Sequence, residues 1–139
     1  MAYDPNNPFA KILRGELPSI PVYENEYVLA IMDIMPQSPG HTLIVPKVAG
    51  ENLLDTSAES LAASILAAQR VARAIDKALS PAGIVITQFN RAAAGQTVFH
   101  LHIHVIPVYD DRDWQRHARV KADPAVLEAQ AARIRAALA

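Results

Sequence analysis

The sequence contains no cysteine among its 139 residues. Disulfide bonds, thiolate metal sites and a cysteine nucleophile are therefore excluded, and the chain is compatible with a reducing compartment. Long apolar runs are also lacking, since the longest stretches fall far short of the roughly 20 residues that cross a bilayer. The polar start, Met1–Pro5, has no apolar segment of the kind that a signal peptide needs. We therefore expect a cytoplasmic protein without a membrane segment.

An excess of charge of either sign is lacking as well. Lysine and arginine number 13 against 14 aspartate and glutamate residues, which gives a formal net charge of -1. Such a chain has no overall attraction to nucleic acid or to anionic lipid, so any anionic ligand must be held by a local site. The 51% hydrophobic content is typical of a globular protein, and 139 residues suffice for one domain with a substantial core.

Turn residues and apolar spacing predict an α+β fold, with strands grouped before and after one long helix. That helix is expected to start at a capping box, Thr56–Glu59, and to end before Pro81. Its predicted core face consists of Leu61, Ile65, Ala68, Ala72, Ile75 and Leu79. Strands are expected over residues 20–24, 27–33, 41–46, 83–89 and 99–106.

Two further helices are predicted at the ends of the chain. The first covers residues 8–17, with Phe9, Ile12 and Leu13 on one side. The second begins at Asp123–Pro124, with proline in its first turn, and its apolar residues are Val126, Leu127, Ile134 and Leu138. The strands over 83–89 and 99–106 are close enough in sequence to pair as an antiparallel hairpin.

Three histidines alternate with apolar residues in the segment 99–106. Because side chains alternate along a strand, His100, His102 and His104 are expected on one face and their apolar neighbours on the other. One interpretation is purely structural. A second is a metal site, because neutral imidazole is a common metal ligand, although no carboxylate lies within this run.

The third interpretation is nucleophilic catalysis at phosphorus. An imidazole can attack a phosphoryl group if one ring nitrogen is free and the other is held as N–H by an acceptor, while neighbouring imidazoles donate to the phosphate oxygens. The loop before the histidines adds Gly95, where backbone N–H groups can approach a phosphate, and the side-chain donors Gln96 and Thr97.

The segment Gly95–Ile106, GQTVFHLHIHVI, resembles the signature of the histidine triad (HIT) family, in which three histidines alternate with apolar residues. Phe9–Ile12, Ile31–Ile34 and Pro39–Lys47 resemble further family segments, so the similarity covers approximately residues 7 to 109. It is closest to the Hint-like and bacterial branch. The resemblance implies a HIT fold: a five-stranded antiparallel sheet, one long helix, a short N-terminal helix and here an extra C-terminal helix.

The resemblance also implies a role for each histidine. His102 would be the nucleophile that attacks the α-phosphate of a nucleotide conjugate, and the main-chain carbonyl of His100 would hold its other nitrogen. His104 would contact the phosphate oxygens, and His41 would support the cluster from a neighbouring strand. Thr97 stands where the family places a hydroxyl near the leaving group. No cofactor is implied.

A nucleotide pocket follows from the same resemblance. Asp33 matches the acidic residue that binds ribose hydroxyls, and the loop would contribute contacts to the phosphate. The nucleotide-binding residues expected are Asp33, Ile12, Ile31, Ile34, Asn90, Gly95 and Gln96. The three isoleucines would wall the base, and Asn90 would replace a family asparagine from a shifted position.

Several positions depart from the family pattern. Many bacterial members carry zinc ligands where this chain has Asn7, Ala10 and Ala49, so no metal site is expected. Counting back from Gly95 places Phe89 at the family asparagine and Arg91 at a family glycine. Arg91 is then a solvated charge or a contact to a second phosphate, and Trp114 in the tail is expected to be exposed or packed rather than to cross a dimer.

Together these features predict a single HIT-like domain over residues 1–139, with residues 110–139 as a tail not clearly part of the family core. The expected protein is a homodimeric hydrolase or transferase that acts on purine nucleotide conjugates of the AMP type, as a purine-nucleoside phosphoramidase. Two alternatives remain: a dinucleoside polyphosphate hydrolase, and a nucleotide-binding or scaffold protein with vestigial catalysis. The sequence leaves the physiological leaving group open.

Overall fold

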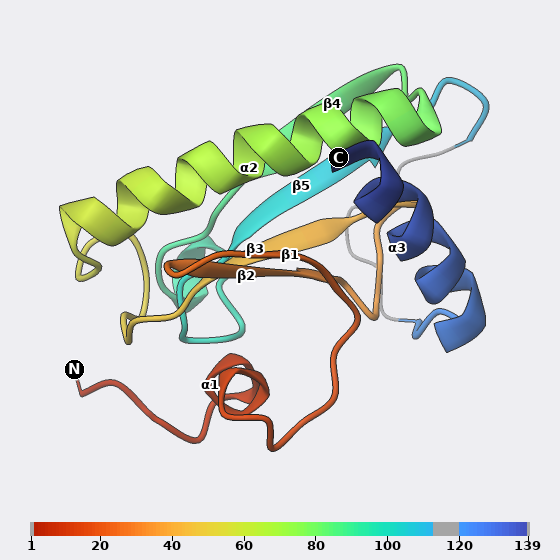
Figure 1. Ribbon diagram of the computed structural model, residues 1–139. Helices are drawn as coiled ribbons and strands as arrows, with labels where there is room; N and C mark the ends of the chain where they lie inside the picture. The colour runs from red at the N-terminus through yellow and green to blue at the C-terminus, as the bar shows by residue number, and fades with distance from the viewer. Residues whose placement is uncertain (1, 113–119, 139) are drawn as a thin grey trace.

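The centre of the molecule is a five-stranded antiparallel sheet with the strand order β1-β2-β3-β5-β4 (Figure 1). A computed structural model describes residues 2–112 and 120–138. The strands are β1 (Pro21–Glu24), β2 (Val28–Met32), β3 (Thr42–Pro46), β4 (Gly83–Thr87) and β5 (Ile103–Val108). The helices are α1 (Pro8–Leu13), α2 (Ala58–Leu79) and α3 (Pro124–Leu138), with a 3₁₀ turn, η1, at Ala92–Ala94. The predicted α+β class and the antiparallel pairing of β4 with β5 are confirmed. Trp114, for which the sequence predicts an exposed or packed side chain, lies outside the described residues.

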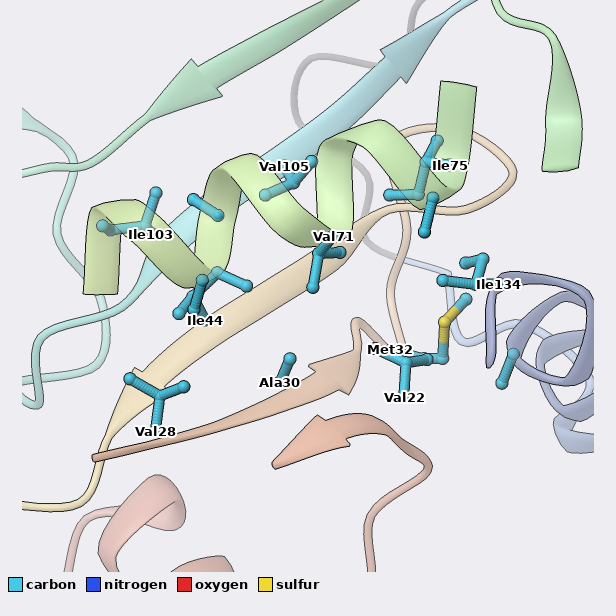
Figure 2. Close-up of a cluster of buried hydrophobic side chains, with 14 of the residues drawn as sticks. Val22, Val28, Ala30, Met32, Ile44, Val71, Ile75, Ile103, Val105 and Ile134 are labelled. Carbon is cyan, nitrogen blue, oxygen red and sulfur yellow. The ribbon is translucent and has the colours of Figure 1, made fainter. Parts of the chain in front are cut away.

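The helices divide unequally between the two faces of the sheet. The long helix α2 runs along one face with α3 beside it, and the short helix α1 lies on the other face (Figure 1). Apolar side chains from α2, α3 and the strands fill the space on the α2 face (Figure 2). The smaller cluster on the α1 face consists of Phe9, Leu29, Ile31, Leu43 and Val45. No helix within residues 2–112 and 120–138 is long and apolar enough to cross a membrane.

The long helix begins one residue later than the predicted capping box implies. Its N-cap is Ser57, whose hydroxyl accepts the backbone N–H of Ser60. Thr56, which the capping box would place at the cap, is buried and donates its hydroxyl to the Asn52 carbonyl instead. The hydroxyl of Thr56 is therefore used to close the preceding turn rather than to start the helix.

Burial on α2 follows its small residues rather than its largest apolar ones. Ala68 and Ile75 are buried as predicted, but Ile65 is 51% exposed, so the prediction of Ile65 on the core face is wrong. The buried positions are Ser60, Ser64, Ala67, Ala68, Val71, Ala74 and Ile75. Serine and alanine are small, so the side of α2 that carries them can lie close to the sheet. Ile65 is on another side of the helix and is exposed.

Helix α3 packs onto α2 and β1. Leu127 and Ile134 are buried in the main core as expected, together with Ala131, whereas Val126 is 50% exposed. The tail, which the resemblance did not clearly include in the family core, contributes part of the main hydrophobic cluster through α3.

The histidine segment is only partly a strand, which corrects the strand expected over residues 99–106. β5 starts at Ile103, so His104 lies in the strand while His100 and His102 precede it. The ladder between β3 and β5 ends at the pair Ile44 and Ile103. Pro46, two residues beyond Ile44, has no N–H to extend the ladder, and its carbonyl accepts from the His100 ring.

Candidate active site

Four histidines lie together on the α1 face of the sheet. His41 stands just before β3, and it and His100 are buried, with exposed fractions of 0% and 1%. The rings of His102 and His104, which are only partly buried, have centroids 5.0 Å apart, and those of His41 and His104 are 5.2 Å apart. His102 and His104 are therefore the two imidazoles that a ligand can reach.

His102 has one ring nitrogen free. Its Nδ1 lies 2.7 Å from the main-chain carbonyl oxygen of His100. Because a carbonyl can only accept, Nδ1 must carry the proton, and Nε2 then holds a lone pair. Burial lowers the pKa of His102, and the hydrogen bond to the His100 carbonyl opposes that shift only in part. The ring is thus neutral near pH 7, as a nucleophile must be.

His104 is held in the opposite tautomer. The backbone N–H of Gln37 donates to His41 Nδ1 over 3.0 Å, so the proton of the neutral His41 ring is on Nε2. That Nε2 lies 3.0 Å from His104 Nδ1 and donates to it, which leaves the proton of His104 on Nε2. Burial, followed by the neighbouring imidazoles, lowers the pKa of His41 to about 3 and that of His104 to about 4. His104 therefore offers an N–H donor beside the lone pair of His102.

Asp33 lies next to this pair. Its Oδ1 accepts the backbone N–H of Met35, and its Oδ2 is 3.5 Å from His41 Nε2. Burial raises the pKa of Asp33 to about 6, against the opposing effect of the Met35 hydrogen bond. Since His41 is neutral, the contact is not an ion pair, and the Asp33 carboxylate remains an acceptor for other donors near pH 7.

The three isoleucines expected to wall a base do not lie in one environment. Ile31 is 3% exposed within the cluster on the α1 face, and the half-buried Ile12 packs against the same cluster. Ile34, beyond the end of β2, is 48% exposed. Ile12 and Ile31 therefore share one apolar cluster, in which only Ile12 is partly accessible, and Ile34 lies outside that cluster.

Gln96 holds the loop in place instead of offering donors to a phosphate. Its Nε2 donates to the carbonyls of Glu51 at 2.6 Å and Val98 at 3.0 Å, and its Oε1 accepts the Arg91 backbone N–H at 2.7 Å. Both amide hydrogens are thus used inside the protein, which differs from the role expected from the sequence. Asn90 is engaged through its oxygen, since its Oδ1 accepts the backbone N–H of Leu53 and the Nε2 of Gln88.

The backbone of the loop adopts conformations that favour glycine. Gly95 has φ of 109°, and Arg91 has φ of 77° with ψ of 156°. The second combination is sparsely populated by residues other than glycine. Arg91 stands where the counted alignment places a family glycine, so the loop keeps a glycine-type geometry with an arginine in it. Phe89, two residues earlier, sets its ring edge against His104 at a centroid distance of 5.8 Å.

Within the described residues, Asp33, His41 and His104 bring possible metal-ligand atoms within 4.8 Å of one another. Their hydrogen bonds do not suit a metal ion. A histidine that binds metal through one nitrogen donates its other N–H to an acceptor, but His41 Nδ1 faces the N–H of Gln37. His41 could then ligate only as an unfavourable imidazolate.

The positions that correspond to zinc ligands in many bacterial members do not fit a zinc ion either. Asn7 uses its side-chain oxygen as the N-cap of α1, where it accepts the Ala10 N–H at 2.9 Å. Ala10 and Ala49 carry no ligand atom. These residues therefore provide no zinc site.

Three contacts to the histidines are not predictable from the sequence pattern. The Tyr3 hydroxyl lies 2.5 Å from His100 Nδ1, and the Gln37 N–H orients His41. Phe9 packs edge-on against His102 with ring centroids 4.7 Å apart. Phe9 belongs to a recognisable motif, but no pattern links Tyr3 to a histidine 97 residues away.

Thr97, the hydroxyl expected near a leaving group, is exposed on the loop that leads to the histidines. Its two neighbours in the chain are Gln96, which is buried, and Val98, whose carbonyl accepts a hydrogen bond from Gln96 Nε2. The structure thus keeps Thr97 accessible on a constrained stretch of backbone.

Comparison with known proteins agrees with this geometry. The sequence matches the family described as HIT domain over residues 14–111. Protein hit of Bacillus subtilis is 41% identical over 115 residues, which cover 79% of this chain and 79% of that protein. Adenylylsulfatase HINT3 of Arabidopsis thaliana is 41% identical over 99 residues, which cover 71% of this chain and 50% of the plant protein. A crystal structure of a Hit-like protein involved in cell-cycle regulation from Bartonella henselae, with an unknown ligand, has a TM-score of 0.93 at 48% identity, and the match covers 99% of each chain.

Proposed function

Because this chain belongs to the HIT family, we propose that it is a nucleotide hydrolase that releases AMP from phosphoramidate-type conjugates through a covalent adduct on His102. The observation that carries this proposal is the pair of opposite tautomers. His102 Nε2 has a lone pair, whereas His104 Nε2 carries a proton, and the two rings are 5.0 Å apart. One imidazole can therefore attack phosphorus while the next donates to its oxygens.

The chemistry has two displacement steps. In the first, His102 Nε2 bonds to the α-phosphorus as the bond from phosphorus to the leaving group breaks, and the departing amine takes a proton that the Thr97 hydroxyl helps to deliver from solvent. The positive charge that develops on the imidazole is stabilised by the His100 carbonyl at Nδ1. In the second, water attacks phosphorus, gives its proton to solvent and releases AMP, which returns the lone pair to His102.

The nucleoside would be held beside the histidines by Asp33 and an apolar wall. The Asp33 carboxylate accepts hydrogen bonds from the ribose hydroxyls, and the half-buried Ile12 presents an apolar surface to a purine base, with the buried Ile31 in the cluster that supports it and the exposed Ile34 at its edge. In this proposal the backbone of Gly95 contacts the phosphate and the exposed hydroxyl of Thr97 contacts the leaving group. Gln96 and Asn90 act indirectly in this proposal, by fixing the shape of the loop.

The leaving group is the part that an experiment must decide. The Arabidopsis relative is named as an adenylylsulfatase, which favours cleavage of an activated nucleoside monophosphate over cleavage of a polyphosphate. We therefore expect adenosine 5′-phosphoramidate and adenylyl sulfate to be hydrolysed faster than diadenosine tetraphosphate in parallel steady-state assays. Faster cleavage of the tetraphosphate would contradict the proposed substrate class, and nucleotide binding without turnover of any substrate would support the binding-protein alternative.

A chelator provides a second arm of the same assay. Since the tautomers of His41 and His104 are set by hydrogen bonds, turnover should be unchanged after treatment with a strong chelator. Loss of turnover that returns with a stoichiometric metal ion would contradict a reaction carried by imidazoles alone.

A homodimer is the proposed assembly. In the described part of the chain, β4 pairs only with β5, so its outer edge is open. Ile86 lies on that edge and is 44% exposed, and alternation along the strand places it on the same face as Ile84, which packs against the α2 core. An open apolar edge of this kind favours pairing with a second copy.

Sedimentation can test the dimer directly. The wild-type protein should sediment as a dimer and Ile86→Lys as a monomer, because a charge would then lie on the paired edge. Val126→Lys is a matched control, since Val126 is 50% exposed on α3, away from β4. A wild-type monomer at all concentrations, or a dimer unaffected by Ile86→Lys, would contradict this assembly.

A further inference from the structure

We propose that Tyr3 and Asn7 are positioning residues for the nucleophile, because they fix the His100 ring and thereby the carbonyl that orients His102. The inference rests on the proposed role of His102 and names two residues that act on it through His100. Both come from the N-terminal segment and α1, on the face of the sheet that carries the histidines (Figure 1).

The contacts form a continuous chain of hydrogen bonds. Asn7 Nδ2 lies 2.9 Å from the Tyr3 hydroxyl, which lies 2.5 Å from His100 Nδ1. On the far side of the ring, His100 Nε2 is 2.8 Å from the Pro46 carbonyl. The Tyr3 and His100 rings also meet edge to face at a centroid distance of 5.7 Å. His100 is therefore held at both ring nitrogens.

The direction of every bond in this chain is determined. The Pro46 carbonyl only accepts, so His100 Nε2 carries the proton and the Nδ1 of the neutral ring must accept. The Tyr3 hydroxyl consequently donates to Nδ1, and the Asn7 amide donates to the Tyr3 oxygen. Burial lowers the pKa of His100, which agrees with a neutral ring.

Asn7 is itself rigidly placed. Its Oδ1 caps α1 by accepting the Ala10 N–H, and its Nδ2 also donates to the Asp4 carbonyl at 2.8 Å. Asn7 therefore connects the start of α1 to Tyr3, and Tyr3 to His100. The hydroxyl of Tyr3 cannot turn away from His100 without losing the donor that Asn7 gives it.

The chain ends at the acceptor of the nucleophile. The His100 side chain is pinned at its ring, and the next backbone group, the Leu101 N–H, donates to the Gly50 carbonyl at 2.9 Å. The same peptide group carries the His100 carbonyl, which lies 2.7 Å from His102 Nδ1. That carbonyl is thus oriented from both sides, and with it the direction of the His102 lone pair. A phenylalanine at position 3 could fill the same space but could not supply the proton.

Tyr3→Phe removes only the hydroxyl and tests the proposal. Its matched control is Tyr23→Phe. Tyr23 lies in β1, away from the histidines, and its hydroxyl accepts from Asn25 Nδ2. We expect Tyr3→Phe to lower the rate constant of adduct formation about tenfold, since small misplacements of a nucleophile are costly. KM for the nucleotide and the melting temperature should stay near the wild-type values, and the control should change none of these.

Nitrogen NMR of the histidine rings provides a readout that general destabilisation would not change. In the wild type, His100 should show a protonated Nε2 and an unprotonated, hydrogen-bonded Nδ1. Tyr3→Phe should shift the Nδ1 signal toward that of a free nitrogen and make the Nδ1–H of His102 exchange faster with water. Tyr23→Phe should leave both signals in place.

Asn7→Asp is the second variant, because it keeps the cap on α1 but reverses one bond. A carboxylate still accepts the Ala10 N–H, yet it attracts the Tyr3 hydroxyl proton instead of donating to the oxygen. The proton is then drawn away from His100, so the shift of the Nδ1 signal and the lower adduct rate should both recur.

Unchanged ring signals and an unchanged adduct rate in Tyr3→Phe would overturn the proposal. So would a loss of activity that only follows a lower melting temperature, with a normal rate per folded molecule. If the wild-type protein formed no adduct at all, the proposed function would fail, while the nitrogen signals would still decide whether Tyr3 holds His100.

Discussion

The two faces of the sheet differ in what their side chains do. Among the residues that the structure describes, the α2 face buries a cluster of 15 apolar residues, while the cluster on the α1 face has 5 and shares that face with the histidines. The alternation of β5 separates the two sets: Ile103 and Val105 belong to the main core, and His104, between them, pairs with Leu43 on the other face. One face can therefore stabilise the fold while the other keeps buried imidazoles in defined tautomers.

The strongest test of this division is His102→Ala. Removal of the attacking imidazole should reduce kcat by about a thousandfold or more, because no other ring in the cluster has a free Nε2. The melting temperature should change little, and AMP should still bind. Steady-state kinetics, calorimetric titration and thermal unfolding measure the three quantities. Retained turnover would show that the nucleophile lies elsewhere.

The converse change is Ile75→Ala on the α2 face. Ile75 is 0% exposed, so its truncation should lower the free energy of unfolding by about 2–5 kcal/mol. Turnover per folded molecule should be unchanged, as measured by urea unfolding and by kinetics on the same samples.

Ile65→Ala is the matched control for that experiment. Ile65 lies on the same helix but is 51% exposed, and its truncation should cost about 0.5 kcal/mol or less. Equal costs for the two isoleucines would contradict the observed orientation of α2, and a loss of turnover in folded Ile75→Ala would show that the two faces are not independent.

A fall in pH should lower the free energy of unfolding through the histidines on the α1 face. His41 and His104 have folded pKa values of about 3 and about 4, so the unfolded chain, with pKa values near 6.5, binds protons first. Their contribution to stability is full above about pH 6.5 and is lost as the pH falls to their folded pKa values, about 4 for His104 and about 3 for His41. Asp33, with a pKa raised to about 6, acts in the opposite direction below pH 6.

The two histidines outweigh the one carboxyl, so the free energy of unfolding should fall by about 2 kcal/mol between pH 7 and pH 5. Urea titrations at a series of pH values measure this slope. His41→Asn, whose amide can still donate and accept, should reduce the slope. A slope that His41→Asn leaves unchanged would locate the acid sensitivity outside this face.

The smallest expected effect concerns the loop at Arg91. Its φ of 77° and ψ of 156° suit glycine, so Arg91→Gly should relieve strain that exceeds the added freedom of the unfolded chain. We expect a gain of about 1 kcal/mol in urea unfolding. Arg91→Ala, which keeps the strain, is the control and should give no gain. Equal stabilities of the glycine and alanine variants would show that the backbone is not strained there.

The sequence predicted the parts of this molecule that depend on local pattern. Alternation along β5 placed His104 opposite Ile103 and Val105, and Pro124 marked the start of α3. The prediction failed for Ile65, because helical spacing does not reveal which flank of α2 lies closest to the sheet. The start of β5 could not be predicted locally, because it depends on Pro46 in β3, a strand that is far from β5 in sequence but pairs with it in the sheet.

The site was predictable only at its centre. The repeat around His102 indicated the histidine cluster, and the resemblance supplied the role of the His100 carbonyl, which lies 2.7 Å from His102 Nδ1. The hydrogen bonds that fix the tautomers come from Tyr3 and Gln37, through contacts that no spacing rule reports. Gln96 belongs to the recognised motif, but only the structure shows that its amide group donates to carbonyls of the protein and not to a ligand.

The central claim, that the lone pair of His102 attacks the α-phosphorus, can be measured directly by mass spectrometry. The wild-type protein is mixed with adenosine 5′-phosphoramidate, stopped within milliseconds without acid and digested. We predict an adenylyl mass increment on the peptide that contains His102, present during turnover and absent after substrate is exhausted. Turnover without any such adduct, or an adduct on a different residue, would contradict the account.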